Sequence, residues 1–278
     1  MAIIADRFYR IVVDALTHDR LTLPTLPEVA LRIQDLLRCD EVSITRVVKE
    51  IQTDPALTVR LIRVANSAAV RGGRNVDSIQ QAVTRLGLEY TRLLVNGLVL
   101  EQMFRSGNSA LRERLRRCWC DSVEVAALAR AVASQCTLLQ PEMAMLGGLV
   151  HRIGTLPILR MAEVHADAIP SPEALDEVIA ELGPKVGRMV LRAWHFPPEL
   201  VELPMAWPQL DRDHAAAADY ADVVIVAVTR LRSEYEKHSA IERLPTFAKL
   251  DLATDFELGE GGPLAVHYRE SLGLLQAA

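Results

Sequence analysis

Apolar residues recur three or four positions apart along most of the chain, which is the spacing of one face of an α-helix. A clear early case is LPEVALRIQDLL, whose apolar positions are Leu26, Val29, Ala30, Ile33, Leu36 and Leu37. No run alternates convincingly as a strand would. VVIVAV (residues 223–228) could be a strand in isolation, but its capped, alanine-rich surroundings favour a helix. The pattern predicts an all-α fold, a compact multi-helix bundle.

Capping residues divide the first part of the chain into short helices. Ser43 is placed to cap ITRVVKEIQ, and Asp54 with Pro55 supplies an N-cap carboxylate and a proline at the first helical position. That helix runs through ALTVRLIRVANSA and should end before RGGR. Ser78 caps IQQAVTRL, and Gly87 stands at its C-terminal end, where a left-handed residue is common.

The middle and the end of the chain also have helical periodicity. A loop is expected over Ser106–Arg114, and the proline-rich stretch 196–208 should interrupt the helices. The segment from Asp213 to His238 is expected to form one long final helix. The remaining helices are expected over residues 89–104, 119–135, 141–150, 173–183 and 185–196.

Composition narrows the class of protein. The 278 residues carry a formal net charge of −5, which gives no global case for a nucleic-acid or membrane partner. The N-terminus does not resemble a signal peptide, and apolar runs such as LLVNGLVL fall short of the ~18 residues that a membrane span needs. A cytoplasmic protein is expected. Its four cysteines, including the CWC pair, lack the spacing of a structural zinc site and are expected to be plain thiols.

Three segments resemble the signature of the HDOD domain family, an offshoot of the HD superfamily of metal-dependent phosphohydrolases. They are LPTLPEVALRI, TDPALTVRLIRVANSA and SIQQAVTRLGLEYTRLLV, and GGLVHRIGTLPIL matches a segment that in relatives usually reads L-L-H-D-I-G. The resemblance runs from about Leu21 to Trp207. It divides the chain into an N-terminal helix (1–20), an HDOD domain (21–214) and a helical C-terminal extension packed on it (215–278).

The resemblance implies a bacterial, non-enzymatic domain that acts through protein contacts in signalling, motility or stress control, often beside modules that handle cyclic dinucleotides. No response-regulator, GGDEF or EAL sequence occurs in the chain, which implies a stand-alone copy.

An HD hydrolase gathers histidines and aspartates around divalent ions that activate a water. By the resemblance, Asp121 stands where relatives have histidine, and the H-D pair has become His151-Arg152. Gly183 and Ala206-Trp207-Pro208 occupy further places where relatives often carry histidine, and only Asp222 could match the last aspartate. The vestigial positions are therefore Asp121, His151, Arg152 and Asp222. No catalytic residue, metal or cofactor is expected.

His151 has two further interpretations. It could end a helix with its ring bonded to a carbonyl or a carboxylate, or it could bind a small anion together with Arg152, whose guanidinium stays charged. The other histidines considered are expected to be surface or cap residues without partners at metal-ligand spacing: His165, His195, His214, His238 and His267.

The segment from Pro55 to Arg92 contains six arginines and only two acidic residues, Asp77 and Glu89, which gives it a local net charge of +4. They could be solvated residues paired with acidic neighbours, a docking surface for an acidic protein, or a nucleic-acid or nucleotide site. The candidate docking surface consists of Arg60, Arg63, Arg71 and Arg74. The helix after Gly87 is too apolar to read a major groove. Asn66 is expected to tie its helix end to the following loop.

These observations predict a regulatory, non-catalytic protein with unidentified signalling proteins as partners. A divergent HD phosphohydrolase acting on a nucleotide is the alternative, and a nucleic-acid-binding regulator is the second alternative. Arg152 and the replaced ligands argue against the enzyme, and the acidic total charge argues against nucleic acid. Leu21 to Trp207 is expected to fold as one cooperative unit.

Overall fold

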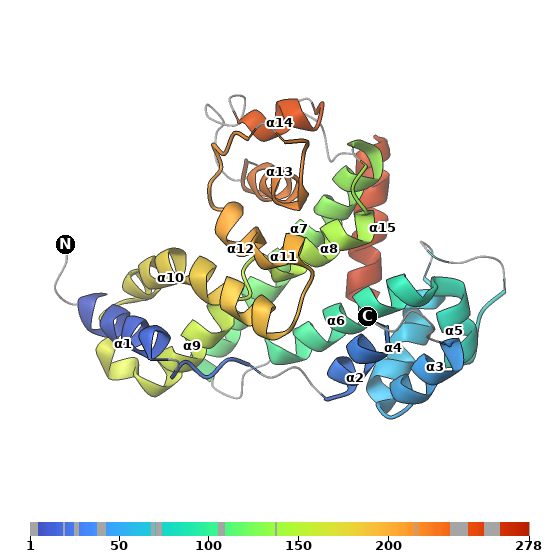
Figure 1. Cartoon of the computed structure of the whole chain (residues 1–278), viewed down its shortest axis with the longest axis horizontal. Helices are drawn as coiled ribbons and strands as arrows, with labels where there is room; N and C mark the ends of the chain where they lie inside the picture. The colour runs from blue at the N-terminus through green and yellow to red at the C-terminus, as the bar shows by residue number, and fades with distance from the viewer. Residues whose placement is uncertain are drawn as a thin grey trace.

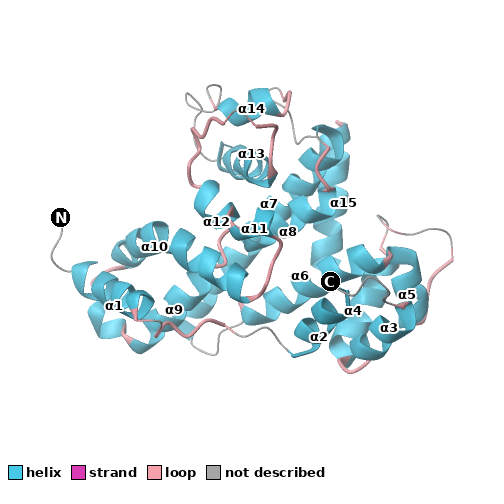
Figure 2. Ribbon diagram, in the orientation of Figure 1, coloured by secondary structure: helices cyan, strands magenta, loops and turns pink. Residues whose placement is uncertain are grey.

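The described part of the chain consists of helices and their connections, without strands (Figure 2). The predicted all-α class is therefore confirmed. Within this part no helix is long and apolar enough to cross a membrane. The computed structural model describes residues 5–18, 20–24, 28–37, 43–67, 70, 74–104, 109–136, 138–214, 216–233, 244–252 and 262–277.

Four short helices form a lobe at one end of the molecule, seen at the right of Figure 1. They are α2 (Glu28–Leu37), α3 (Ile44–Ile51), α4 (Pro55–Ala65) and α5 (Ile79–Leu86). The predicted N-caps are confirmed, because Ser43, Asp54 and Ser78 accept hydrogen bonds from the backbone N–H groups of Arg46, Leu57 and Gln81. Gly87 ends α5 with a φ of +78°, a conformation that favours glycine.

Three longer helices form the centre. They are α6 (Leu88–Met103), α7 (Ser109–Cys136) and α8 (Pro141–Val150). The stretch from Leu94 to Leu100 in α6 is buried, so the helix after Gly87 belongs to the core, as its apolar sequence indicated. Helix α7 begins at Ser109, and most of the loop expected over Ser106–Arg114 is helical. Of that loop, residues 106–108 lie outside the described part.

A second group of helices lies at the opposite end, at the left of Figure 1. It contains α1 (Ala5–Thr17), α9 (Thr155–Val164), the short 3-10 helix η1 (Ala166–Ala168) and α10 (Pro172–Ala193). Helix α1 packs on α9 and α10, and the Tyr9 hydroxyl donates to the Glu181 carboxylate at 2.7 Å. The N-terminal helix is thus attached to the second half of the sequence.

The prediction of two helices separated at Gly183-Pro184 was wrong. Helix α10 continues through Pro184 to Ala193. A proline removes one backbone hydrogen bond, that of the carbonyl four residues earlier, here Ala180. Ala180 is exposed, so water can replace the missing donor.

The end of the chain also differs from the prediction. Residues 213–219 are not helical where described, and α13 runs only from Tyr220 to Ser233. It is not the final helix, because α14 (Pro245–Lys249) and α15 (Pro263–Ala277) follow. Asp219 caps α13 by accepting from the N–H groups of Ala221 and Asp222 at 2.9 and 3.0 Å, which sets where the helix begins.

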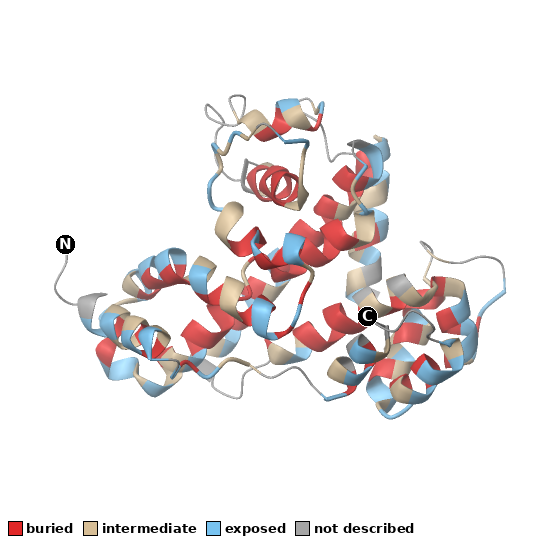
Figure 3. Cartoon of the chain, viewed as in Figure 1, coloured by how far each residue is buried: buried red, intermediate tan, exposed pale blue. Residues whose placement is uncertain are grey.

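The core runs through the whole described molecule, along the central helices (Figure 3). Helix α7 packs on α8, α13 and α15. Two glycines allow helices to approach closely beside His151. A Cβ on Gly148 would lie 2.4 Å from the Cα of Ala126, and one on Gly154 would lie 2.0 Å from the carbonyl oxygen of Gly183. These contacts fix the turn that carries His151 and Arg152.

Candidate functional site

His151 ends α8 and borders two hollows, one lined by α10 and the other by α7 and α13. It is 3% exposed, and its Nδ1 lies 2.6 Å from the carbonyl oxygen of Gly148. The interpretation of His151 as a helix-end residue bonded to a carbonyl is therefore confirmed. The turn Arg152–Gly154 then leads directly into α9.

Trp207 covers His151. Its Nε1 donates to the His151 carbonyl oxygen at 2.8 Å, and the two rings meet edge to face with centroids 5.0 Å apart. The short helices α11 (Pro198–Val201) and α12 (Leu203–Ala206) hold Trp207 in this place. At a position where relatives were inferred to carry histidine, this chain thus has a ring that closes over His151.

Arg152 forms an ion pair with Asp121 of α7, with Nη1 3.6 Å from Oδ2. The side chains of Arg152 and Asp121 are 30% and 58% exposed, so the pair lies at the mouth of the site. Three of the four vestigial positions, Asp121, His151 and Arg152, are thus neighbours. The cation stands next to the carboxylate that a metal ion would need as a ligand.

Asp222, the fourth vestigial position, lies elsewhere. From α13, the described residues that border the hollow beside Asp121 and His151 are Val228 and Leu231. Asp222 is six residues before Val228, which places it about 9 Å further along the helix at ~1.5 Å per residue. Its carboxylate is fully buried and accepts from Arg212 at 3.2 Å and from the Asp219 N–H at 3.0 Å, and it lies 2.9 Å from His214 Nε2.

The prediction that His214 has no partner at metal-ligand spacing was wrong. His214, Asp219 and Asp222 bring ligand atoms within 4.8 Å of one another, and they are the group with metal-like geometry among the described residues. Arg212 also occupies this cluster, with bonds of 2.6 and 2.9 Å to Asp219. Because the guanidinium and the α13 backbone already use these oxygens, the cluster fits a helix-capping network better than a metal centre.

A metal ion of the HD type does not fit the residues at His151 either. Asp121 is paired with Arg152, and Gly183 and Trp207 supply no ligand. Cys118, buried nearby at 4% exposure, has its thiol pKa raised by burial, so a thiolate is disfavoured there. At an effective dielectric constant of ~20, a cation and a metal ion a few ångströms apart repel by several kcal/mol.

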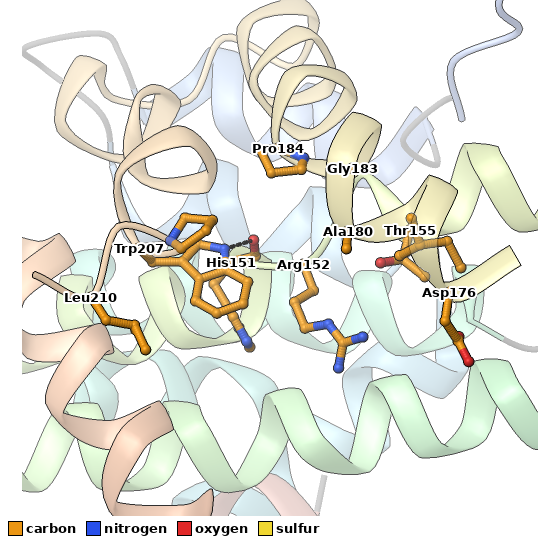
Figure 4. Close-up of a pocket in the computed structure, with 11 residues that line it drawn as sticks. His151, Arg152, Thr155, Asp176, Ala180, Gly183, Pro184, Trp207 and Leu210 are labelled. Carbon is orange, nitrogen blue, oxygen red and sulfur yellow. Dashed lines mark hydrogen bonds between the residues drawn. The ribbon is translucent and has the colours of Figure 1, made fainter. Parts of the chain in front are cut away.

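Hollows flank the His151-Arg152 turn on both sides. The larger has a volume of about 340 Å³, and its walls include His151, Arg152, Thr155, Ile179, Gly183 and Trp207. The smaller, of about 170 Å³, lies toward Asp121 and α13. In Figure 4 the Arg152 side chain extends between Trp207 and His151 on one side and Asp176 on the other.

The predicted arginine surface is only partly intact. Arg60 binds Glu101 of α6 at 2.6 Å with both side chains about one-fifth exposed, so its charge is already paired within the fold. Arg63 and Arg74 are exposed, whereas Arg71 lies outside the described residues. Arg85 donates to the carbonyl oxygens of Ala65 and Arg74 and so supports the loop between α4 and α5.

Asn66 supports the same loop, as predicted. Its Nδ2 donates to the Val76 carbonyl at 2.7 Å, and its Oδ1 accepts from the Val76 N–H at 2.8 Å. The arrangement holds the loop at both of its ends.

Comparison with known proteins identifies the family to which this helical bundle belongs. The sequence profile of the HDOD domain matches residues 23–207, two-thirds of the chain. The chain therefore belongs to the HDOD domain family, which confirms the resemblance in its sequence.

Solved structures extend the likeness beyond the matched domain. A protein from Shewanella amazonensis SB2B, named provisionally as a metal-dependent phosphohydrolase, is 29% identical with a TM-score of 0.86, over 98% of this chain and 99% of that one. An HDOD domain protein with unknown function from Geobacter sulfurreducens is 22% identical with a TM-score of 0.64, over 96% and 88%. The latter likeness concerns the fold alone.

A curated relative is an uncharacterized protein of Treponema pallidum (strain Nichols), 22% identical over 188 residues. The match covers 64% of this chain but only 36% of the Treponema protein. The chain thus spans about a third of the length of that relative.

Proposed function

We propose that this chain is a non-catalytic regulatory protein that acts in bacterial signalling through contacts with other proteins. The ion pair between Arg152 and Asp121 carries the proposal. It places a permanent cation where HD hydrolases need a metal ligand and occupies the nearest carboxylate. A structural neighbour from Marinobacter aquaeolei VT8 is named provisionally as a signal transduction protein, which agrees with this role.

A divergent phosphohydrolase is the second candidate, because the Shewanella relative bears that provisional name. Hydrolysis assays separate the two. Purified chain would be given p-nitrophenyl phosphate, nucleoside triphosphates and cyclic dinucleotides with Mg²⁺, Mn²⁺ or Fe²⁺. We expect the parent chain to show no more turnover than His151→Ala or Asp121→Asn. Because the Asp121 side chain is exposed, Asp121→Asn should leave the core intact. Metal-dependent turnover that both variants lose would establish the enzyme instead.

The exposed end of the loop between α4 and α5 is the proposed contact surface. Arg74 is exposed there, Arg85 donates to the Arg74 carbonyl oxygen, and Asn66 bonds Val76, so the backbone at Arg74 and Val76 is tied to the ends of α4 and α5. A preorganised arginine is favourable for binding, because less freedom is lost and its planar head can bond an acidic partner bidentately.

Charge reversal tests this surface. The double variant Arg63→Glu, Arg74→Glu should keep the melting temperature, because both arginines are exposed and exposed pairs contribute only ~0–1 kcal/mol each. It should lose the proteins that co-purify with the chain from its native cells. Lys185→Glu, at an exposed position of α10, is the matched control and should retain them. If the double variant retains the same partners, the contact surface lies elsewhere.

A further inference from the structure

The larger hollow beside His151, which we call the Arg152 pocket, has the form of a ligand site. Its volume of about 340 Å³ lies near the lower end of the range for small-molecule pockets, ~300–1,000 Å³. Most of its wall is apolar, contributed by Ile179 of α10 and by Trp207, Pro208 and Leu210 after α12. Arg152 and Thr155 supply polar groups on the side of α9 (Figure 4).

Trp207 is a fixed wall of this pocket. The bond from its Nε1 to the His151 carbonyl and the edge-on contact with the His151 ring hold the indole in place. A rigid aromatic surface next to proline and leucine suits a flat apolar group, because little side-chain freedom is lost when such a group packs against it.

Arg152 provides the positive charge of the pocket. Among the described residues its ion pair is with Asp121, and the 3.6 Å separation is longer than a hydrogen bond. Asp121 is also largely exposed, which weakens the pair further. Guanidinium nitrogens on the pocket side are therefore available to a carboxylate, which they can bind bidentately.

The acidic neighbours limit the charge that the pocket accepts. Asp176 also lines it, but Arg114 binds both oxygens of Asp176 at 2.6 and 3.1 Å and neutralises it. Arg152 supplies the positive charge of the pocket, and the carboxylate of Asp121 already lies beside its guanidinium. A single negative charge is thus better matched than the two charges of a phosphate monoester.

We propose that the Arg152 pocket binds a small organic monocarboxylate with a planar apolar body. Its carboxylate would pair with Arg152, and its flat part would lie against Trp207 and Ile179. This inference goes beyond the proposed function, because it gives the regulatory domain a small-molecule input. It does not depend on the partner surface at Arg74, so either can fail without the other.

The experiment uses 2-naphthoate as the probe and 2-naphthamide as its neutral counterpart. Binding to the full chain is followed by the indole N–H signals in two-dimensional NMR, with the Trp207 signal assigned from Trp207→Phe. We expect 2-naphthoate to shift the Trp207 signal and to bind at least about tenfold more tightly than 2-naphthamide, as expected for a hydrogen bond to a charged group. Arg152→Gln should remove that difference.

Two further variants make the result specific. Ala180→Phe, at an exposed position that borders the pocket, should block 2-naphthoate while leaving the fold intact. Arg160→Gln, at an exposed position of α9, should bind like the parent. The proposal is overturned if 2-naphthoate leaves Trp207 unchanged, if Arg152→Gln or Ala180→Phe binds it as well as the parent does, or if 5′-AMP binds more tightly than 2-naphthoate.

Discussion

The guanidinium of Arg152, in the turn that joins α8 to α9, lies 3.6 Å from the carboxylate of Asp121 in α7. Both residues stand at positions where HD hydrolases were inferred to carry metal ligands. The positive charge at this place therefore belongs to the Arg152 side chain. The same change exposes a guanidinium to an apolar hollow. It therefore bears both on the proposed absence of metal chemistry and on the proposed binding of an anion.

The close contact of α9 with α10 should tolerate no side chain at Gly154. Gly154→Ala would place a Cβ 2.0 Å from the Gly183 carbonyl oxygen and 2.5 Å from the Gly187 nitrogen, and neither backbone atom can rotate away. We expect a loss of at least about 3 kcal/mol in the free energy of unfolding. Urea denaturation measures it.

Gly273→Ala is the matched control for Gly154→Ala. Nothing lies within 4 Å of a Cβ at this position in α15, so alanine should stabilise the helix by ~0.5–1 kcal/mol. Equal effects of the two substitutions would contradict the close approach of α9 and α10.

The tie between Asn66 and Val76 should contribute measurably to stability. Asn66→Ala removes two hydrogen bonds in a half-buried place, and we expect the free energy of unfolding to fall by about 1–3 kcal/mol. Thr84→Ala, which removes an exposed bond within α5, should change it by less than about 0.5 kcal/mol. Chemical denaturation measures the free energy of unfolding of both variants. If Asn66→Ala unfolds with the same free energy as the parent, the bonds between Asn66 and Val76 do not contribute to stability.

Local and distant determinants of the fold differ in how well the sequence predicts them. Ser43, Asp54 and Ser78 act on the helix that follows each, so their roles were predictable from a few neighbouring residues. The continuation of α10 through Pro184 depends on the exposure of Ala180, which a single sequence does not show.

The candidate site shows the same division. The substitution at Arg152 was visible in the sequence, but its pairing with Asp121 and the cover that Trp207 forms over His151 depend on helices far apart in the chain. The network of Arg212, His214 and Asp222 was missed because the alanine-rich segment 213–219 favours a helix by composition. Asp219, just before the apolar run of α13, was the available sign of a cap.

Asp222 should be essential for the packing of α13. Asp222→Ala would leave His214 and the Asp219 N–H without their buried acceptor, and we expect a loss of about 1–3 kcal/mol. Asp213→Ala is the control: its carboxylate is 77% exposed and lies 3.7 Å from Lys249, so its loss should cost under ~1 kcal/mol. Thermal unfolding compares the two, and similar melting temperatures would rule out a structural role for the network.

The same network should make stability depend on pH. Burial alone would raise the pKa of Asp219, but hydrogen bonds from Arg212 and from the Asp222 N–H hold that pKa below its ordinary value of about 3.9. As pH falls, the unfolded chain takes up this proton before the folded chain does, so this contribution is present above pH ~4 and is lost below it.

Asp219→Asn tests that dependence, because asparagine also caps helices but does not titrate in this range. Urea unfolding from pH 6 down to pH 3 should show the stability advantage of the parent over Asp219→Asn shrinking as the pH falls. An advantage that stays constant across this range would show that Asp219 does not contribute to the acid sensitivity.

The proposed non-catalytic role of the His151 site is tested most directly by elemental analysis of the purified, dialysed chain. His151→Ala and Asp219→Asn, analysed beside it, distinguish the two places where histidine and carboxylates meet. We expect no stoichiometric iron, manganese or zinc in the parent chain. About one such ion per chain, retained in Asp219→Asn and lost in His151→Ala, would contradict the non-catalytic interpretation.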